Sequence, residues 1–506
     1  MNKTPLEKRT AAFRDYVKRM MSYSQALAIL NWDLRTKAPR KGVDARSELI
    51  GVMSGEHFRL LTSPELAEHL AALQEAGTWE QLDAITRGTV QECQKELARF
   101  QKIPADRYQK FVTLAAKSGA VWEEARAAND FASFRPYLEE VVKFQLEFIE
   151  YWGYQDNKYD TLLDIYEPGM TVAQLDPLFR QLREKTVSLV NAIAAAPYKP
   201  DTRFLGKHYP EAAQEAFSRF VLEKIGYDFQ AGRLDRSVHP FCTSFAPGDV
   251  RITTRFNPDH LNEALFGCIH EAGHAIYEQN INPELFGTPL CDGASMGIHE
   301  SQSRFWENMV GRSLPFWQHF FAEAVRRFPD QLAGVSVKQF YHAVNEVTPS
   351  LIRIEADEVT YNLHIMIRYE IEKGLIEQTI EVGELPTIWN QKMKEYLGVV
   401  PSTDSEGVLQ DVHWSDGSFG YFPTYSLGNM YAAQIAAVMK KQISGYEQLI
   451  ARGEFAPIRE WLHQNIHQYG KLKSPSQLLH DITGEAPNAD YLVEYLESKY
   501  KAIYQL

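Results

Sequence analysis

Apolar residues recur every three or four positions through most of this 506-residue chain, with glutamate, lysine, glutamine and alanine between them. This spacing places apolar side chains on one face of a helix, as in amphipathic helices that share a core. It predicts helices at 6–32, 64–75, 79–100, 121–152, 173–196, 210–225, 303–328, 337–346, 350–380, 384–396, 426–451, 456–468 and 488–502. No repeat or flexible linker is apparent, so we expect residues 1–506 to form one domain of helical lobes around a central groove. We expect the candidate chemistry described below to lie within residues 236–430.

One short region departs from the helical spacing. Residues 241–245 and 250–256 are rich in β-branched and aromatic side chains, and they flank the sequence APGD at 246–249. This arrangement predicts a β-hairpin with a Pro-Gly turn. Alternation predicts two faces, one with Asp249, Arg251 and Thr253 and the other with Val250, Ile252 and Thr254. The hairpin edge offers a place for an extended peptide to pair, or the hairpin is only a structural flap.

Charge and cysteine usage narrow the class of protein. The formal net charge is −13 and no basic run is present, which argues against nucleic acid or an anionic membrane as the main partner. Four cysteines are scattered without CxxC spacing, as in reduced cytosolic proteins. The first residues lack the apolar core of a signal peptide, and no stretch approaches the length of a membrane span. We therefore expect a soluble, cytoplasmic protein.

The sequence HEAGH at 270–274 carries the candidate chemistry. His270 and His274 are about one helical turn apart, so both imidazoles can hold one metal ion. Glu271 lies where a carboxylate can reach a water on that metal without itself being a ligand. The sequence NPD at 257–259 resembles a helix start, with an asparagine cap and a proline in the first turn.

The residues around this motif predict a half-buried helix. Apolar side chains recur at helical spacing, namely Leu261, Leu265, Ile269, Ala272 and Ile276. The two histidines flank this apolar stripe, as a metal site requires. The alternative, a solvated polar helix face that matches the motif by chance, does not explain the stripe.

A third ligand is needed, because catalytic zinc normally takes three protein ligands and leaves one position for water. Glu300 lies 26 residues after His274, which allows the chain to turn and bring a second helix beside the first. Glu307 is the competing candidate. Glu300 could instead be an exposed carboxylate that pairs with Arg304 four residues later.

Several short motifs follow one another along the chain, namely HPF at 239–241, DVRIT at 249–253, HEAGH at 270–274, HESQ at 299–302, IRIEAD at 352–357 and GVLQDVHW at 407–414. Together they resemble the carboxypeptidase Taq family of metallocarboxypeptidases. The sequence NWDLRTKAP at 31–39 is similar to the family's opening segment. The resemblance favours Glu300 over Glu307 as the third ligand.

The resemblance implies an all-α, mostly helical fold with a small β-hairpin near the active site, shaped as a groove like the neurolysin-like metallopeptidases. It implies zinc, with cobalt as a functional substitute, and a homodimer. It also implies stepwise release of amino acids from peptides with a free C-terminus, with broad specificity. In this reading His270, His274 and Glu300 hold the metal, and Glu271 takes a proton from the water and later passes it to the leaving amine.

Further roles follow from what such a reaction needs. An oxyanion requires hydrogen-bond donors, for which the candidates are His413, Tyr421 and Tyr425, unless these tyrosines are ordinary aromatic core. The substrate carboxylate requires a cation, for which Arg353 is the strongest candidate. Other candidate substrate-binding residues are His239, Arg251, Thr253, Asp357, Gln302 and Gln410.

Arg353 is expected on a helix with a polar stripe that continues through Asp357, Thr360 or Tyr361, and His364. The alternative for Arg353 is a purely structural ion pair with Asp357. Asp357 and Asp411 are candidate hydrogen-bond partners of the ligand imidazoles.

Two other functions stay open at this point. A neurolysin-like oligo-endopeptidase would share the metal chemistry but lack the carboxylate anchor. A metal-binding scaffold without catalysis is the other alternative, and the intact Glu271 argues against it.

Overall fold

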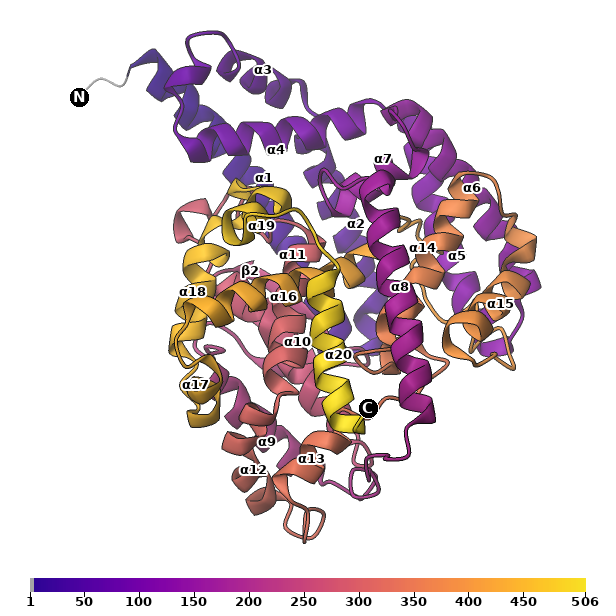
Figure 1. Cartoon of the computed structure of the whole chain (residues 1–506). Coiled ribbons are helices and arrows are strands. Elements are labelled where there is room, and N and C mark those ends of the chain that lie inside the picture. Colours follow the sequence, from indigo (N-terminus) through magenta and orange to yellow (C-terminus); the bar gives the residue numbers. More distant parts are fainter. Residues whose placement is uncertain (1–3) are drawn as a thin grey trace.

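The computed structural model describes residues 4–506 and consists mainly of helices with one small sheet (Figure 1), which confirms the predicted fold class. The N-terminal helices extend from the top of this view down to its middle. They are α1 (Pro5–Thr36), α2 (Val43–Leu61), α3 (Pro64–Leu73) and α4 (Ala84–Gln101), with the 3₁₀ turns η1 (Arg40–Gly42) and η2 (Trp79–Gln81).

These N-terminal helices have their own small core, which includes Phe13, Leu70 and Val90 and is separate from the main core. The second half of α1 buries only Trp32, and α2 buries only its last two residues. The sequence pattern did not predict α2, because its apolar residues Val43, Leu49 and Val52 are exposed rather than arranged along a buried face.

The main core extends from α5 to the C-terminal helix. Its first helices are α5 (Ala105–Ala128), α6 (Phe131–Trp152), α7 (Lys158–Tyr166), α8 (Val172–Ala195) and α9 (Glu211–Ile225). The single helix predicted at 121–152 is divided between α5 and α6, since Asn129 adopts a left-handed conformation and the Asp130 side chain caps the next helix. Short polar capping residues favour this kind of break.

The sheet has the strand order β1-β3-β2, with β1 (Leu234–Arg236), β2 (Cys242–Ala246) and β3 (Asp249–Thr254). The predicted hairpin is confirmed as the antiparallel pair β2–β3, while β1, which pairs with β3 in parallel, was not predicted. Val250 and Ile252 are fully buried and Arg251 is partly exposed, so the predicted alternation holds along this part of β3. Strand β2 lies at an edge of the sheet.

The central helices follow the sheet. They are α10 (Leu261–Gln279), α11 (Met296–Arg304), α12 (Leu314–Arg327), α13 (Val337–Ala343), α14 (Tyr361–Ile376) and α15 (Leu385–Leu397), with the short turns η3 (Pro283–Leu285), η5 (Arg353–Glu355) and η6 (Val382–Glu384). A π-helix, η4 (Phe305–Gly311), continues directly from α11. The C-terminal helices are α16 (Pro423–Gln442), α17 (Tyr446–Arg452), α18 (Ala456–Asn465), α19 (Pro475–Thr483) and α20 (Asp490–Tyr504), with η7 (His467–Leu472) between α18 and α19.

Two of the helix starts that differ from the sequence prediction concern candidate site residues. Helix α10 begins at Leu261 rather than near Asn257, whose side chain instead accepts a hydrogen bond from the Asp259 backbone in a local turn. Helix α14 begins at Tyr361, because the Asp357 carboxylate accepts backbone N–H groups just before it. Arg353 therefore lies in η5 and not on a long helix, and the predicted polar stripe is wrong.

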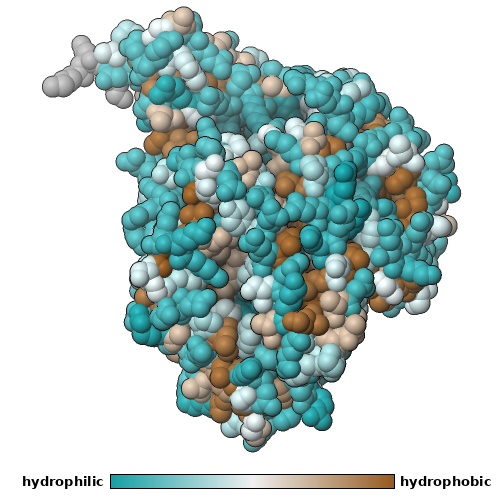
Figure 2. Space-filling view, viewed as in Figure 1, coloured by the Kyte–Doolittle hydropathy of each residue, from teal (hydrophilic) through white to brown (hydrophobic). Residues whose placement is uncertain are grey.

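On the face shown in Figure 2, hydrophobic residues form small groups within a largely hydrophilic surface. Within residues 4–506, no helix is both long enough and apolar enough to cross a membrane.

Candidate active site

Three predicted metal ligands come together at the centre of the molecule. Helix α10 supplies His270 and His274, and α11 supplies Glu300, with one ligand atom of each within 4.8 Å of the others. The Glu300 Oε2 atom lies 3.3 Å from His274 Nε2 and 3.6 Å from His270 Nε2. All three side chains line a cavity of about 870 Å³.

This arrangement fits a four-coordinate metal ion. Ligand bonds of roughly 2.0–2.1 Å at tetrahedral angles place neighbouring donor atoms roughly 3.3 Å apart. Two imidazoles and one carboxylate are also a donor set typical of catalytic zinc. Burial lowers the pKa of His274 to about 3, so its ring is neutral and able to act as a ligand.

Close packing of α10 against α11 brings Glu300 to the histidines. At Gly273, within the HEAGH motif, a methyl group would lie 2.6 Å from both Gln302 O and Ser303 Cα. Glycine is therefore required there for the approach of the two helices. The apolar side of α10, represented by Leu265 and Ile269, is buried as predicted.

Glu307 contacts the first ligand from the other side. Its carboxylate lies 2.9 Å from His270 Nδ1, so the opposite ring nitrogen is the one that faces Glu300. Although burial opposes ionisation, Arg304 and His270 lower the pKa of Glu307 to about 2. An ionised Glu307 accepts the Nδ1 proton and leaves Nε2 free for a metal. Glu307 is therefore placed as a support for His270, while Glu300 completes the cluster.

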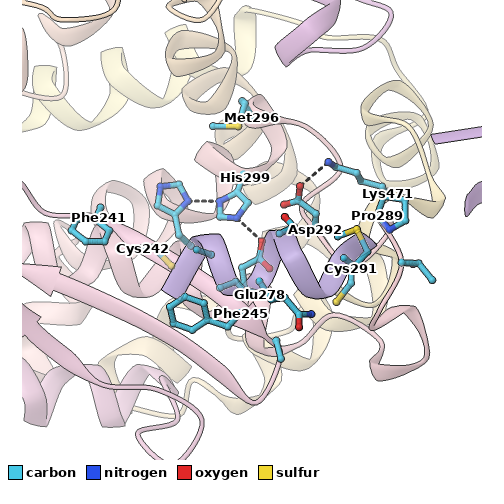
Figure 3. Close-up of a pocket in the computed structure, with 18 of the residues that line it drawn as sticks. Phe241, Cys242, Phe245, Glu278, Pro289, Cys291, Asp292, Met296, His299 and Lys471 are labelled. Atoms are coloured by element: carbon cyan, nitrogen blue, oxygen red, sulfur yellow. Dashed lines mark hydrogen bonds and ion pairs between the residues drawn. The ribbon is translucent and has the colours of Figure 1, made fainter. Parts of the chain in front are cut away.

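The second ligand has a different partner, which the sequence reading missed. His274 Nδ1 lies 2.5 Å from His299 Nδ1, and His299 Nε2 lies 2.8 Å from the Glu278 carboxylate (Figure 3). With a metal on His274 Nε2, His274 donates to His299, which in turn donates to Glu278. Gly293 packs against this ring, since a methyl group there would meet His299 Cδ2 at 2.5 Å. The position of His299 directly before Glu300 was the available sequence signal.

Glu300 is held by its own helix. Arg304 Nε donates to Glu300 Oε1 at 2.6 Å, and Ser303 Oγ donates to Oε2 at 3.0 Å. The pairing of Glu300 with Arg304 four residues later, which was the alternative to a ligand role, is thus present, and Glu300 lies in the ligand cluster at the same time. A methyl group at Gly428 of α16 would lie about 2.6 Å from the Glu300 side chain, so packing as well as charge fixes this carboxylate.

The partners predicted for the imidazoles lie elsewhere. Asp411 accepts hydrogen bonds from Arg353 and Arg368, and Asp357 accepts them from Thr348, Val359 and Thr360. Neither carboxylate is placed on His270 or His274. The alternative Arg353–Asp357 ion pair is not formed, and Arg353 pairs with Asp411 instead, because the chain between Arg353 and Asp357 is not a continuous helix.

Glu271 lines the cavity beside the ligand cluster. It is only 8% exposed, and burial raises the pKa of its carboxyl group to about 7. A carboxyl group of this kind can both accept and return a proton near neutral pH.

Tyr421 and Tyr425 line the same cavity, near the start of α16. Burial raises the pKa of the Tyr421 hydroxyl to about 12 and that of Tyr425 well above its usual value, so both hydroxyls stay protonated donors. His413 packs against them, with ring centroids 5.3 Å from Tyr421 and 6.4 Å from Tyr425. Burial lowers the pKa of His413 to about 4, so its ring is neutral.

Arg353 lies behind these tyrosines. Its guanidinium carbon is 5.0 Å from the centroid of the Tyr425 ring, and its Nη1 group donates to Tyr361. Nε and Nη2 donate to Asp411, which also accepts from Arg368. Two buried guanidinium groups thus share one carboxylate, since Arg353 Nη2 lies 2.8 Å from Asp411 Oδ1 and Arg368 Nη2 lies 2.6 Å from Asp411 Oδ2. Arg353, Arg368 and Asp411 together therefore carry a net positive charge.

The remaining candidate substrate-binding residues, apart from His239, make contacts with other residues of the protein. Gln302 accepts a hydrogen bond from His467, and Gln410 binds the Arg353 backbone N–H. Thr253 is fully buried and bonds Ser237. His239 is exposed, and Arg251 is paired with Asp249.

The cavity continues beyond the metal ligands. There it is bordered by Glu278, Met296 and Cys291, and by the ion pair of Asp292 with Lys471 at 2.6 Å (Figure 3). Strand β2 forms part of its wall, with Cys242 and Phe245 facing the space.

Known proteins with the same organisation identify the family. The family model for the carboxypeptidase Taq (M32) metallopeptidases matches residues 12–500. Carboxypeptidase 1 of Bacillus subtilis (strain 168) is 47% identical over 494 residues, which are 98% of each chain. The M32 carboxypeptidase structure from Deinococcus radiodurans R1 aligns with a TM-score of 0.96 at 35% identity over 99% of this chain and 100% of the other.

Trypanosoma cruzi metallocarboxypeptidase 1 aligns with a TM-score of 0.91 at 34% identity, over 98% of this chain and 99% of the other. Matches of this length confirm the predicted metallocarboxypeptidase function and do not favour the endopeptidase alternative. By sequence and by structure, this chain belongs to the carboxypeptidase Taq (M32) family of metallopeptidases.

Proposed function

We propose that this protein releases amino acids one at a time, and with broad specificity, from peptides with a free C-terminus. The observation that carries the proposal is the convergence of His270, His274 and Glu300 beside Glu271 in the wall of one cavity. We propose zinc as the metal, with cobalt as a functional substitute, because the donor set suits both. When bound, the ion supplies a nucleophilic water at neutral pH and polarises the scissile carbonyl.

Glu271 is the proposed proton carrier. Its carboxylate accepts a proton from the attacking water and then donates it to the amine of the leaving amino acid. Burial holds the pKa of Glu271 near 7, which suits both steps. The hydroxyls of Tyr421 and Tyr425 donate to the oxygen that becomes negative at the carbonyl carbon, with His413 packed behind them.

Arg353 is the proposed anchor for the substrate carboxylate. The excess positive charge of Arg353 and Arg368 over Asp411 is buried next to Tyr425, which lines the cavity. A carboxylate that enters beside Tyr425 neutralises this charge and gains charge-assisted hydrogen bonds. Such an anchor selects the last peptide bond for hydrolysis, since it fixes the distance between the chain end and the metal ligands.

The peptide upstream of the scissile bond is proposed to pair with β2. This strand is an edge of the sheet, and its residues Cys242, Ser244, Phe245 and Ala246 line the cavity that the ligand cluster also lines. Backbone pairing of this kind is independent of side-chain identity, which agrees with broad specificity.

The experiment is mass spectrometry of a peptide mixture incubated with zinc-loaded protein, with each peptide present as the free acid and as the C-terminal amide. We expect ladders that shorten from the C-terminus of the free acids only. Internal cleavage, or equal cleavage of the amides, would establish the endopeptidase alternative instead. Arg353→Ala should raise KM for the free acids by roughly 10²-fold, as expected for loss of a charge-assisted contact.

Three further properties belong to this proposal. A homodimer is testable by light scattering of the purified protein. A cytoplasmic location is supported by the four cysteines, none of which forms a disulfide within residues 4–506. A single domain over residues 1–506, with its catalytic core at 236–430, is testable by calorimetry.

A further inference from the structure

Two of the family-like sequence segments, NWDLRTKAP at 31–39 and DVRIT at 249–253, contain no metal ligand, and they contact each other in the structure. Trp32, near the end of α1, is 5% exposed. The guanidinium carbon of Arg251 on β3 lies 4.7 Å from the Trp32 ring centroid, and that of Arg233, just before β1, lies 5.2 Å away. Arg251 was predicted to bind substrate, whereas its planar group here lies over an indole ring.

The two guanidinium groups are held in place by the sheet. Arg251 donates twice to Asp249, both at 2.7 Å, and Arg233 donates twice to Asp235, at 2.5 and 2.8 Å. Pairing of β1 with β3 places these two arginines beside each other. Bidentate pairs fix the orientation of both planar groups, so the sheet presents a preorganised cationic surface to the indole.

This contact fastens one wall of the cavity. Residues of α1 and α2 line the same cavity as the ligand helices, namely Met20, Met21, Ser24, Gln25, Ala28, His57 and Leu61. Beyond Met20, Trp32 is the one residue that α1 buries, and it belongs to neither the small N-terminal core nor the main core. The remaining links from this part of the chain to the sheet include Arg35 over Phe241, at 5.7 Å, and the Lys37–Asp235 ion pair, at 3.6 Å.

We propose that Trp32 is a positioning residue, which clamps the α1–α2 wall to Arg233 and Arg251 of the sheet and thereby sets the width of the peptide groove. The proposal rests on the proposed function in one respect, because the groove is taken to hold a peptide. It assigns Asp249 and Arg251 to the support of this clamp. Trp32 touches neither the ligand cluster nor Glu271, so its loss alters peptide binding and leaves the chemistry in place.

The test is Trp32→Ala in the full-length, zinc-loaded protein. We expect KM for a tetrapeptide to rise about tenfold, which corresponds to loss of two cation–π contacts, with kcat within about twofold of the wild type. Zinc affinity, measured by chelator competition, should be unchanged. The segment between α1 and α2 contains Lys37, Arg40 and Lys41. Trypsin should cleave there faster, because the wall detaches more often.

Two control variants define the outcome. Phe229→Ala removes a similar contact, that of Arg219 at 5.2 Å, which does not involve α1, and should leave KM and tryptic cleavage unchanged. Trp32→Phe keeps an aromatic ring and should restore most of the wild-type KM. A wild-type KM and tryptic rate in Trp32→Ala, or an equal rise in KM in Phe229→Ala, would overturn the proposal.

If Trp32→Ala does not fold, Arg251→Lys gives the same two readouts, because lysine keeps the charge but not the planar group. Unchanged KM and unchanged cleavage in that variant would also overturn the clamp. The rate at which trypsin cleaves this protein does not depend on the protein's own peptidase activity. A wild-type protein that releases no C-terminal residue would therefore disprove the proposed function, and the protease result would still decide on the clamp.

Discussion

The Nδ1 atoms of His274 and His299 lie 2.5 Å apart, and the far side of the His299 ring meets Glu278. A candidate ligand is thus oriented by a second histidine rather than directly by a carboxylate. Only a neutral His299 with its proton on Nε2 can accept from His274 and donate to Glu278 at the same time.

Removal of His299 should weaken metal binding. In His299→Ala, His274 loses the acceptor that fixes its ring, and we expect zinc affinity to fall by about 10–100-fold. Chelator competition measures this directly. His480→Ala, at an exposed histidine of α19, is the matched control and should retain wild-type affinity.

Substitutions of Glu300 and Glu307 should differ clearly in their effect on zinc affinity, measured by the same chelator competition. Glu300→Gln removes a ligand and should abolish stoichiometric zinc binding. Glu307→Gln leaves the three ligands in place but removes the charge that supports His270 Nδ1 and pairs with Arg304 and Arg312, and it should cost about 10–100-fold in affinity. The reverse order of effects would make Glu307 the ligand, which was the competing reading of the sequence.

Substitution of Glu271 should lower the rate of catalysis without loss of the metal. Glu271→Gln keeps the shape of the side chain but cannot accept a proton, so kcat should fall by about 10²–10⁴-fold while the zinc content stays at one per chain. Turnover at the wild-type rate in this variant would contradict the proposed mechanism.

Gly273 should not tolerate a side chain. An alanine methyl group would meet backbone atoms of α11 at 2.6 Å, and backbone cannot move aside as a flexible side chain can. We expect Gly273→Ala to lower the free energy of unfolding by about 1–3 kcal/mol and to weaken zinc binding, since Glu300 moves with α11. Gly248→Ala, in the hairpin turn where a methyl group meets nothing within 4 Å, is the control for thermal unfolding.

His467 should make the fold sensitive to acid. Burial lowers the pKa of His467 to about 3 from an ordinary value of 6.5. Between these values the unfolded chain binds more protons, so the stability due to the neutral ring is complete above pH 6.5 and is lost as the pH falls through this window.

The comparison is with His467→Gln, which still donates to Gln302 but does not titrate. Wild type should be more stable at pH 7, and the difference in Tm between the two proteins should narrow as the pH falls to 5. A difference that is constant with pH would show that protonation of His467 is not coupled to unfolding.

The sequence predicted the helical fold and the family because these depend on local periodicity and on short ordered motifs. Helix α10 was predicted from its apolar stripe, although its start was not, because the Asn257 side chain forms a local turn. The contacts that position the site residues were mostly missed. His270–Glu307, Arg353–Asp411 and Trp32–Arg251 join residues that are far apart in sequence, and no spacing rule specifies such contacts.

The continuous segment from α10 to α11 contains all three candidate ligands. Since only one loop must close to bring His270, His274 and Glu300 together, the entropy cost of forming this site is small compared with one assembled from distant segments. A metal ion bound to these ligands joins two helices that are neighbours in the chain, and it stabilises their pairing by mass action. Metal supply during synthesis therefore becomes a factor in the yield of folded protein as well as in its activity.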